Sequence, residues 1–471
     1  MPRTKIVCTI GPASRSPVIL KRLILAGMNV ARLNFSHGTQ SEHRKVITAL
    51  RRLATQLECP IAILQDLAGP KIRISKIGSG TITLKPGALF TLTNRAVRGD
   101  HHEVSINYPD LPKDVRSGDI LLLSDGTLEL IVLKTTDHDI KCRVTIGGLL
   151  NSYKGVNLPT RSIKAPSLTE KDKKDLIFGI KQEVDYVALS FVRSAADALE
   201  AKKFIQEHGV EIPLIAKIEK HEALKNIDEI IRVVDGVMVA RGDLGVETPL
   251  ENVPQVQKML IHRLNLAGKP VITATQMLRS MVNNPRPTRA EVTDVANAIL
   301  DGTDAVMLSE ETAIGKYPVE AVAMMARIAE DAERGFPFDI WINSLGHKSK
   351  KSVPDAVSCA ACSLAESINA ASIIAFTQSG STARLMAKYR PQRPILAATP
   401  QENTYRRLAL NWGVVPILSG RMKNTDEMIE STLRAALISG LVKRGEKVVI
   451  TAGVPVGVPG TTNLIKAEIL K

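Results

Sequence analysis

Gly236-Val-Met-Val-Ala-Arg-Gly-Asp243 is a short apolar run that stops abruptly at charged residues. Seven similar runs, each short enough to be a strand, occupy residues 5–10, 29–35, 60–66, 186–191, 213–219, 270–275 and 304–309. Their Val, Ile, Leu and Ala content is continuous rather than alternating, as in a parallel sheet covered on both faces. Stretches of helical period lie between most of them, for example at residues 18–26, 41–57, 195–207 and 256–267. This repetition predicts a (β/α)₈ barrel.

The interval between Asp66 and Leu168 does not fit the strand–helix repetition because it is much longer than the other intervals between predicted strands. Short β-rich pieces alternate there with Gly, Asp, Asn and Pro turns, at residues 81–84, 89–93, 119–123, 128–133 and 141–145. This pattern predicts a small all-β domain. A domain inserted after a barrel strand stands over the active-site mouth, where it can act as a lid and exclude water.

A third α/β unit is predicted after the loop-like, basic stretch that begins at Gly335. Its expected strands are 372–376, 394–398, 414–418 and 447–451, and its expected helices are 355–368, 383–389, 403–410 and 425–443. We therefore expect barrel segments at 1–68 and 168–345, an inserted β-barrel lid domain at 69–167, and a C-terminal α/β regulatory domain at 346–471.

Composition narrows the class of protein. The chain has no apolar run of the ~18 residues that a membrane helix needs, and it leads into its first strand without a signal peptide, which predicts a cytoplasmic protein. Five scattered cysteines favour reduced thiols over disulfides. Cys359 and Cys362 have the spacing of a redox motif or metal half-site. No second pair accompanies them, and we predict that they lie in a buried helix.

A formal net charge of +14 is compatible with nucleic acid, an acidic surface or small polyanionic substrates as partners. Aromatic residues make up only 3% of the chain, so the stacking platforms of a single-strand binder are missing. Zinc-finger and P-loop patterns are also absent from the sequence. These features favour phosphorylated small molecules, with neither nucleic acid nor membrane as a partner.

The residues at the carboxyl ends of the predicted strands are the candidates for chemistry. Lys217 and Glu219 are two apart on a strand end and should point the same way. Glu219 and Asp243, with no His or Cys nearby, offer the hard oxygens that Mg²⁺ or Mn²⁺ prefers. Lys217 would neutralise developing charge, and guanidinium groups such as that of Arg32 suit phosphate. An ion pair at the rim of the barrel is the alternative for each residue alone, but burying so many charges without a ligand is costly.

Nine stretches, in order along the whole chain, resemble the motifs of pyruvate kinases. They are Lys5-Ile-Val-Cys-Thr-Ile-Gly-Pro-Ala-Ser14, Ala31-Arg-Leu-Asn-Phe-Ser-His-Gly38, Asp66-Leu-Ala-Gly-Pro-Lys-Ile-Arg73, Lys154-Gly-Val-Asn-Leu-Pro159, Ile215-Ala-Lys-Ile-Glu-Lys220, Met238-Val-Ala-Arg-Gly-Asp-Leu-Gly245, Ala274-Thr-Gln-Met-Leu278, Pro285-Arg-Pro-Thr-Arg-Ala-Glu291 and Met307-Leu-Ser-Glu-Glu-Thr312.

The resemblance implies phosphoryl transfer from phosphoenolpyruvate to ADP, giving ATP and an enolpyruvate that is protonated to pyruvate. Arg32 and Lys217 would contact the transferring group, and Glu219 and Asp243 would bind Mg²⁺ or Mn²⁺. Gly242 and Asp243 would contribute to the carboxylate site, and Thr275 would help to organise the protonation. The nucleotide would face Asn34, Phe35, Ser36, His37, Arg73 and Lys154. The resemblance also implies a homotetramer.

Lys71 stands where many pyruvate kinases carry Glu, and those enzymes hold a potassium ion at the counterparts of Asn34, Ser36, Asp66 and the Leu67 carbonyl. A lysine here resembles the branch whose ammonium replaces the ion, so we hypothesise that K⁺ is not required. The alternative is that Lys71 is a solvated lid residue beside a retained ion site. Lys220, where Asn is frequent, and Glu310, where Gly is frequent, are interpreted as tolerated variation.

A phosphate cradle is predicted in the third domain, where several hydroxyls and one glycine precede a helix: Thr377, Ser379, Gly380, Ser381 and Thr382. It resembles the effector loop of regulated pyruvate kinases, with residues 452–460 as the facing loop. That loop lacks the Arg and Trp associated with fructose bisphosphate, so the resemblance implies another phosphorylated activator, such as a sugar monophosphate or AMP. The alternative is an ordinary capped helix start.

Two other classes of function compete with the kinase. One is another barrel enzyme that handles phosphoenolpyruvate or pyruvate, such as a mutase, an aldolase or a dikinase fragment. The inserted β domain and the absence of a phosphohistidine-type segment argue against it. The other is a non-catalytic relative that binds nucleic acid through its positive charge. The intact set Lys217, Glu219, Asp243 and Thr275 argues against that loss of catalysis.

Overall fold

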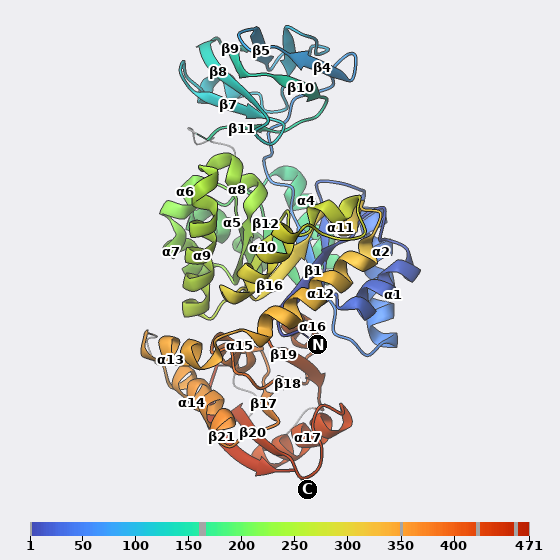
Figure 1. Cartoon of the computed structure of the whole chain (residues 1–471), viewed down its shortest axis with the longest axis vertical. Coiled ribbons are helices and arrows are strands. Elements are labelled where there is room, and N and C mark those ends of the chain that lie inside the picture. The colour runs from blue at the N-terminus through green and yellow to red at the C-terminus, as the bar shows by residue number, and fades with distance from the viewer. Residues whose placement is uncertain (1, 160–165, 349–351, 421–423, 456–459, 471) are drawn as a thin grey trace.

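Three bodies follow one another along the long axis of the molecule (Figure 1). The computed structural model describes residues 2–159, 166–348, 352–420, 424–455 and 460–470. A β insert forms one end, the barrel lies in the middle, and the C-terminal α/β domain forms the other end. No helix in the described part of the chain is long and apolar enough to cross a membrane.

The barrel is closed by eight parallel strands, which confirms all eight predicted runs. Their order around the barrel is β1-β16-β15-β14-β13-β12-β3-β2. The bounds are β1 (Lys5–Thr9), β2 (Val30–Asn34), β3 (Ala62–Asp66), β12 (Tyr186–Leu189), β13 (Leu214–Ile218), β14 (Gly236–Ala240), β15 (Val271–Ala274) and β16 (Ala305–Leu308). The strands end before several predicted boundaries because their last charged residues leave the sheet. Arg241 and Asp243, for example, begin a short helix.

Helices cover the outside of the barrel. They are α1 (Pro17–Ala26), α2 (Gln40–Gln56), α4 (Glu170–Lys181), α5 (Ala195–Glu207), α6 (His221–Lys225), α7 (Ile227–Val233), α8 (Arg241–Glu247), α9 (Val253–Ala267), α10 (Arg289–Leu300), α11 (Glu310–Ala313) and α12 (Pro318–Arg334), with 3₁₀ turns η1 (Leu250–Asn252) and η2 (Arg279–Val282). Thr39, Thr169 and Thr288 start α2, α4 and α10 with capping boxes, which satisfy free N–H groups at each start. The strand side chains form two buried layers, one against these helices and one inside the barrel.

The insert is a curled sheet that stays open, a half-barrel with its own core. Six strands pair in the order β11-β7-β8-β9-β5-β6, and β10 pairs with β4. The bounds are β4 (Thr81–Leu84), β5 (Leu89–Thr93), β6 (Glu103–Ser105), α3 (Leu111–Asp114), β7 (Ile120–Leu123), β8 (Leu128–Thr135), β9 (Asp139–Ile146), β10 (Gly148–Asn151) and β11 (Val156–Asn157). The five predicted strands are present. The sequence did not predict β6, β10 and β11; β6 and β11 are too short to show a pattern.

Two chain segments connect the insert to the barrel and run side by side. Arg73 and Gly155 form an antiparallel bridge, and the N–H of Ile74 donates to the carbonyl of Lys154 at 2.9 Å. The N–H of Val156 donates in turn to the carbonyl of Ile72 at 2.9 Å. This pairing fixes the position of both segments over the carboxyl ends of the barrel strands.

The C-terminal domain is a five-stranded sheet in the order β19-β18-β17-β20-β21. Its elements are α13 (Phe338–Lys348), α14 (Val353–Ser367), β17 (Ser372–Phe376), α15 (Ser381–Lys388), β18 (Ile395–Thr399), α16 (Glu402–Arg407), η3 (Leu408–Leu410), β19 (Val414–Leu418), α17 (Thr425–Ile438), β20 (Lys447–Gly453) and β21 (Thr462–Ile469). The sequence did not predict β21, an antiparallel edge strand that carries Lys466 and Glu468. Cys359 and Cys362 both lie in the helix α14, as predicted, with Cys362 buried and Cys359 half-buried. Burial raises the pKa of the Cys362 thiol well above its usual value.

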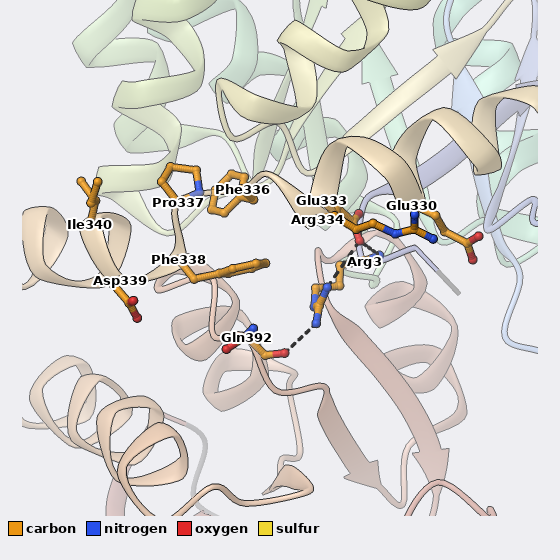
Figure 2. Close-up of a pocket in the computed structure, with 10 residues that line it drawn as sticks. All are labelled: Arg3, Glu330, Glu333, Arg334, Phe336, Pro337, Phe338, Asp339, Ile340 and Gln392. Carbon is orange, nitrogen blue, oxygen red and sulfur yellow. Dashed lines mark hydrogen bonds and ion pairs between the residues drawn. The ribbon is translucent and has the colours of Figure 1, made fainter.

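The C-terminal domain packs against the amino ends of the barrel strands. A cleft of about 670 Å³ opens beside this contact, and Figure 2 shows the residues that line it. Within it, Arg3 donates to the carbonyl of Gln392 at 2.6 Å, and its guanidinium lies 5.2 Å from the ring centre of Phe338. Deeper in the interface, Arg390 is buried and donates to Asp304 at 2.8 Å, at the start of β16.

Candidate active site

Lys217 lies at the centre of a charged cluster at the carboxyl ends of the barrel strands. Its Nζ lies 2.7 Å from Glu219 Oε1 and 3.4 Å from Asp66 Oδ1, and it donates to Ser190 Oγ at 2.7 Å. Burial alone would lower the pKa of Lys217, but the carboxylates of Asp66 and Glu219 outweigh that effect and raise it. The ammonium therefore stays charged inside a largely closed site.

Arg32, the middle residue of β2, adds a second cation to this cluster. Its Nε donates to Asp66 Oδ2 at 2.6 Å, and its Nη1 donates to Thr9 Oγ1 at 2.9 Å. Asp66 Oδ1 is buried and accepts no hydrogen bond within the described structure. Asp66 thus holds both predicted phosphoryl-contacting cations from one side, which leaves donors of Arg32 free for a ligand.

Glu219 and Asp243 are the two carboxylates that were predicted to hold a divalent ion. Glu219 is buried, and its Oε2 accepts from the N–H of Phe191 at 2.8 Å. Asp243 lies on α8, and its side chain is 26% exposed. Burial raises the pKa of Glu219, and the negative charge of the nearby Asp243 raises it further. Burial would also raise the pKa of Asp243, but the cations of Lys71 and Lys217 outweigh that effect and lower it.

The donor set fits a divalent ion. The two carboxylates stand close enough to perturb each other, Asp243 is partly exposed, and positive charge would relieve their repulsion. The two residues fall short of a complete coordination shell, so the remaining positions suit substrate oxygens and water, as Mg²⁺ sites commonly do. No group of three or more acidic, His or Cys side chains that could hold a metal occurs among the described residues.

Thr275 follows β15 and adopts a left-handed conformation with φ 71°, as does Gln276 with φ 56°. Such backbone is unfavourable for residues with a side chain and persists only where the surroundings hold it. The Arg241 guanidinium supplies that support, because it donates to the carbonyl of Thr275 at 2.8 Å and to that of Ala274 at 3.2 Å. Thr275 Oγ1 accepts from the N–H of Gly242 at 2.8 Å, which joins these two predicted substrate-binding residues.

The residues predicted to face the nucleotide come from two places, the loop after β2 and the two connecting segments of the lid. Asn34 Oδ1 accepts from the N–H of Ser36 at 3.1 Å. The Phe35 ring is buried and stacks on His43 at 4.2 Å, so this side chain belongs to the core rather than to the cleft. Partial burial lowers the pKa of His37, and the nearby cations of Arg73, Arg32 and Lys71 lower it further.

Two of the positions predicted for a monovalent site, Asp66 and the Leu67 carbonyl, are engaged by other side chains of the site. The carbonyl of Leu67 accepts from Ser190 Oγ at 2.8 Å, and Asp66 is held by Arg32 and Lys217. The Lys71 ammonium donates to Asp243 Oδ1 at 3.1 Å. Lys71 therefore contacts the predicted divalent-metal carboxylate.

The predicted effector loop connects β17 to α15 and ends at Gly380, which has φ 82° and precedes the first turn of the helix. Ser379 Oγ donates to Ser381 Oγ at 3.2 Å, and Thr382 Oγ1 lies 2.8 Å from Thr462 Oγ1 of β21. A small cleft is lined by Thr377, Ser379, Ser381 and Thr382 and by residues 453 and 460–462. Residues 456–459 of the predicted facing loop lie outside the described residues.

Sequence reasoning missed two hydroxyls that position the cations. Ser190, directly after β12, was given no role, and it accepts from Lys217. Thr9 accepts from Arg32 and is the last residue of β1. A hydroxyl at the end of an otherwise apolar run was the available signal for both.

The fold and this cluster define a (β/α)₈ barrel enzyme with a cationic and acidic centre under an inserted β lid. Comparison with known proteins gives the family. The model described as "Pyruvate kinase, barrel domain" matches residues 1–322, and "Pyruvate kinase, alpha/beta domain" matches residues 355–467. Pyruvate kinase 2 of Synechocystis sp. is 52% identical over 474 residues, covering 100% of this chain and 79% of that protein. Pyruvate kinase of Clostridium acetobutylicum is 47% identical over 473 residues, covering 100% of both chains.

The chain belongs to the pyruvate kinase family. Its activity is transfer of the phosphoryl group of phosphoenolpyruvate to ADP, which gives pyruvate and ATP in glycolysis. The family generally uses a divalent metal ion. This result favours the kinase over the other barrel chemistries and over the nucleic-acid-binding relative.

Proposed function

We propose that Lys217, Arg32 and Thr275 are the catalytic residues of this phosphotransferase, with Glu219 and Asp243 as ligands of Mg²⁺ or Mn²⁺. The observation that carries this assignment is the position of the Lys217 ammonium, which lies between Asp66 and Glu219 while remaining charged. A fixed cation in a water-poor site stabilises charge on a transferring phosphoryl group without reorganisation.

Each side chain has a separate task in this account. Arg32 and Lys217 hold the phosphoryl oxygens. They stabilise the negative charge on these oxygens while the phosphoryl group passes from the enol oxygen of the substrate to ADP. Gly242, Asp243 and Thr275 orient the carboxylate end of the substrate, and the Thr275 hydroxyl organises delivery of a proton to the enolpyruvate carbon. When bound, a divalent ion supplies positive charge to the substrate oxygens on the side of Glu219 and Asp243.

The nucleotide is proposed to bind between the loop after β2 and the lid. Asn34, the Phe35 backbone, Ser36 and His37 line one side, and Arg73 and Lys154 approach from the two connecting segments. Burial, and beyond it the cations of Arg73, Arg32 and Lys71, lower the pKa of His37, so cations of both barrel and lid lie near this residue. Such a cluster attracts the phosphates of ADP.

Lys71 is proposed to remove the requirement for K⁺. Its ammonium donates to Asp243 Oδ1 at 3.1 Å, and its charge adds to the effect of burial in lowering the pKa of His37. A fixed cation there supplies charge that an ion at Asn34, Ser36, Asp66 and Leu67 would otherwise provide. The alternative, in which K⁺ binds these four residues beside Lys71, predicts activity only with K⁺.

Three further assignments are proposed from the family and from the C-terminal domain. A phosphorylated activator binds the loop of Thr377, Ser379, Gly380, Ser381 and Thr382, and the chain assembles as a homotetramer. The domain boundaries are proposed at residues 68/69, 167/168 and 345/346. The cytoplasmic location stays a prediction.

The direct test is pyruvate formation from phosphoenolpyruvate and ADP with Mg²⁺, measured side by side in K⁺ buffer and in K⁺-free buffer. Equal activity in both supports the role given to Lys71. Activity only with K⁺ overturns that role while leaving the catalytic residues in place. A titration with sugar monophosphates and AMP belongs to the same assay, and an unchanged half-saturation for phosphoenolpyruvate would count against the effector site.

A further inference from the structure

A buried ion pair stands directly behind the two proposed metal ligands. Lys220 Nζ lies 2.6 Å from Glu247 Oε1, and the two side chains are 6% and 1% exposed. Lys220 follows Glu219 at the end of β13, and Glu247 is the last residue of α8, the helix that carries Asp243. The pair therefore joins the two segments on which the metal ligands lie.

The spacing of residues on α8 links the position of Asp243 to this ion pair. Asp243 and Glu247 are four residues apart on one short helix, so they lie on the same face. A shift of α8 away from β13 would thus separate Asp243 from Glu219 and would break the Lys220–Glu247 pair at the same time.

The lid contacts the same helix at several points. Asn157 of β11 donates from Nδ2 to Glu247 Oε1 at 3.2 Å, the oxygen that pairs with Lys220. Lys71, on the other connecting segment, donates to Asp243. The turn between β7 and β8 also approaches α8, because a Cβ on Gly126 would lie 3.7 Å from Val246. Each connecting segment of the lid thus reaches one acidic residue of α8.

We propose that Lys220 and Glu247 are positioning residues that hold Asp243 at the separation from Glu219 that a divalent ion needs, and that Asn157 couples this arrangement to the lid. The proposal rests on the proposed metal ligands. Partners behind metal ligands typically change metal affinity by about 10- to 100-fold when they are removed. An ion pair that served only stability would leave metal affinity unchanged.

The test measures binding of Mn²⁺ alone to the full-length enzyme by electron paramagnetic resonance. Removing one partner would leave a buried unpaired charge, so the decisive variant is the double substitution Lys220→Met/Glu247→Gln, which removes both charges. We expect its Mn²⁺ dissociation constant to rise about tenfold. We also expect kcat to recover at saturating Mn²⁺, since the substituted residues do not touch the substrate.

The matched control is a second buried pair, far from the site. Lys388 Nζ lies 3.1 Å from Asp355 Oδ1, and the two side chains are 5% and 6% exposed. The double variant Lys388→Met/Asp355→Asn should keep its Mn²⁺ affinity within twofold of wild type. An equal loss of affinity in both double variants would overturn the positioning role, as would unchanged affinity in Lys220→Met/Glu247→Gln.

Three more variants test the lid coupling and the metal site separately. Asn157→Ala keeps the ion pair, so we expect nearly unchanged Mn²⁺ affinity and a raised KM for ADP; an unchanged KM would overturn the coupling to the lid. Glu219→Gln and Asp243→Asn should each weaken Mn²⁺ binding more than the double variant does. If neither weakens it, the proposed metal site fails together with the positioning role.

Discussion

The two ends of the barrel bury charge in different ways. At the amino end, Asp304 uses both carboxylate oxygens: Oδ1 accepts from Arg390 at 2.8 Å and Oδ2 accepts from the N–H of Val271 at 3.0 Å. Asp185 does the same, with Arg406 at 2.8 Å on one oxygen and the N–H of Ile63 at 2.8 Å on the other. Both arginines come from the C-terminal domain, so these pairs fasten the domain to the barrel.

At the carboxyl end the pairing is incomplete. Lys217 is shared between Asp66 and Glu219, Asp66 Oδ1 accepts no hydrogen bond in the described structure, and Asp243 has Lys71 as its partner at 3.1 Å while remaining 26% exposed. Buried polar groups are normally satisfied, so an incomplete set indicates a place for a ligand. A carboxylate with a partner on each oxygen, as at Asp304 and Asp185, indicates a structural role.

The largest expected effect is the loss of kcat when the charged cluster at the carboxyl end is disrupted. Lys217→Met removes the cation that would stabilise the transferring phosphoryl group, so kcat should fall by about 10³-fold, equivalent to about 4 kcal/mol. Steady-state assays at saturating phosphoenolpyruvate and ADP measure this. A fall of less than tenfold would place the charge stabilisation elsewhere.

Removing a charged pair at the amino end should lower the stability of the fold and leave kcat nearly unchanged. Arg390→Met leaves the Asp304 carboxylate buried without its charged partner, which we expect to lower the free energy of unfolding by about 3 to 5 kcal/mol. Calorimetry reports the thermal midpoint, and assays at substrate saturation should show kcat within about threefold of wild type. An equal fall of kcat in this variant and in Lys217→Met would contradict the different roles given to the two ends of the barrel.

A smaller effect is expected at the exposed edge of the carboxyl-end cluster. Lys71→Met removes the partner of Asp243, and we expect kcat in K⁺-free buffer to fall about tenfold, or about 1.4 kcal/mol. Adding K⁺ to the variant should restore part of the loss, whereas wild type should not respond. Full activity of the variant without K⁺ would contradict the role proposed for Lys71.

A change in the pH dependence of stability is expected at Lys5, at the amino end, whose ammonium donates to the carbonyl of Val414 at 2.7 Å. Burial lowers the pKa of Lys5 to about 8, although Glu333 acts in the opposite direction. The unfolded chain, with a pKa of 10.5, then binds more protons between about pH 8 and 10.5, so stability should rise with pH across that window.

Lys5→Met should remove this dependence. We expect the variant to be more stable than wild type at pH 7 by about 1 to 2 kcal/mol and to lose that advantage as the pH rises above 10. Thermal midpoints at pH 7, 8.5 and 10 provide the measurement. A constant difference between the two proteins at all three values would show that the proton is not released in the folded state.

The barrel could be predicted because each strand is an apolar run flanked by helical periods. The carboxyl-end cluster could be predicted because those runs end in charged residues such as Lys217. The Lys71–Asp243 contact could not, since it joins residues 172 positions apart and depends on where the lid stands. Strand β21 was missed because its exposed, charged side chains hide the pattern of a strand, and the left-handed backbone of Thr275 has no signature in the sequence.

The most direct test of the central claim is a crystal structure with Mn²⁺ and phosphoenolpyruvate, in which anomalous scattering locates the metal. The account predicts one strong peak between Glu219 and Asp243, with the substrate phosphate beside Lys217 and Arg32. A peak bound by neither carboxylate, or a substrate phosphate away from Lys217, would contradict it.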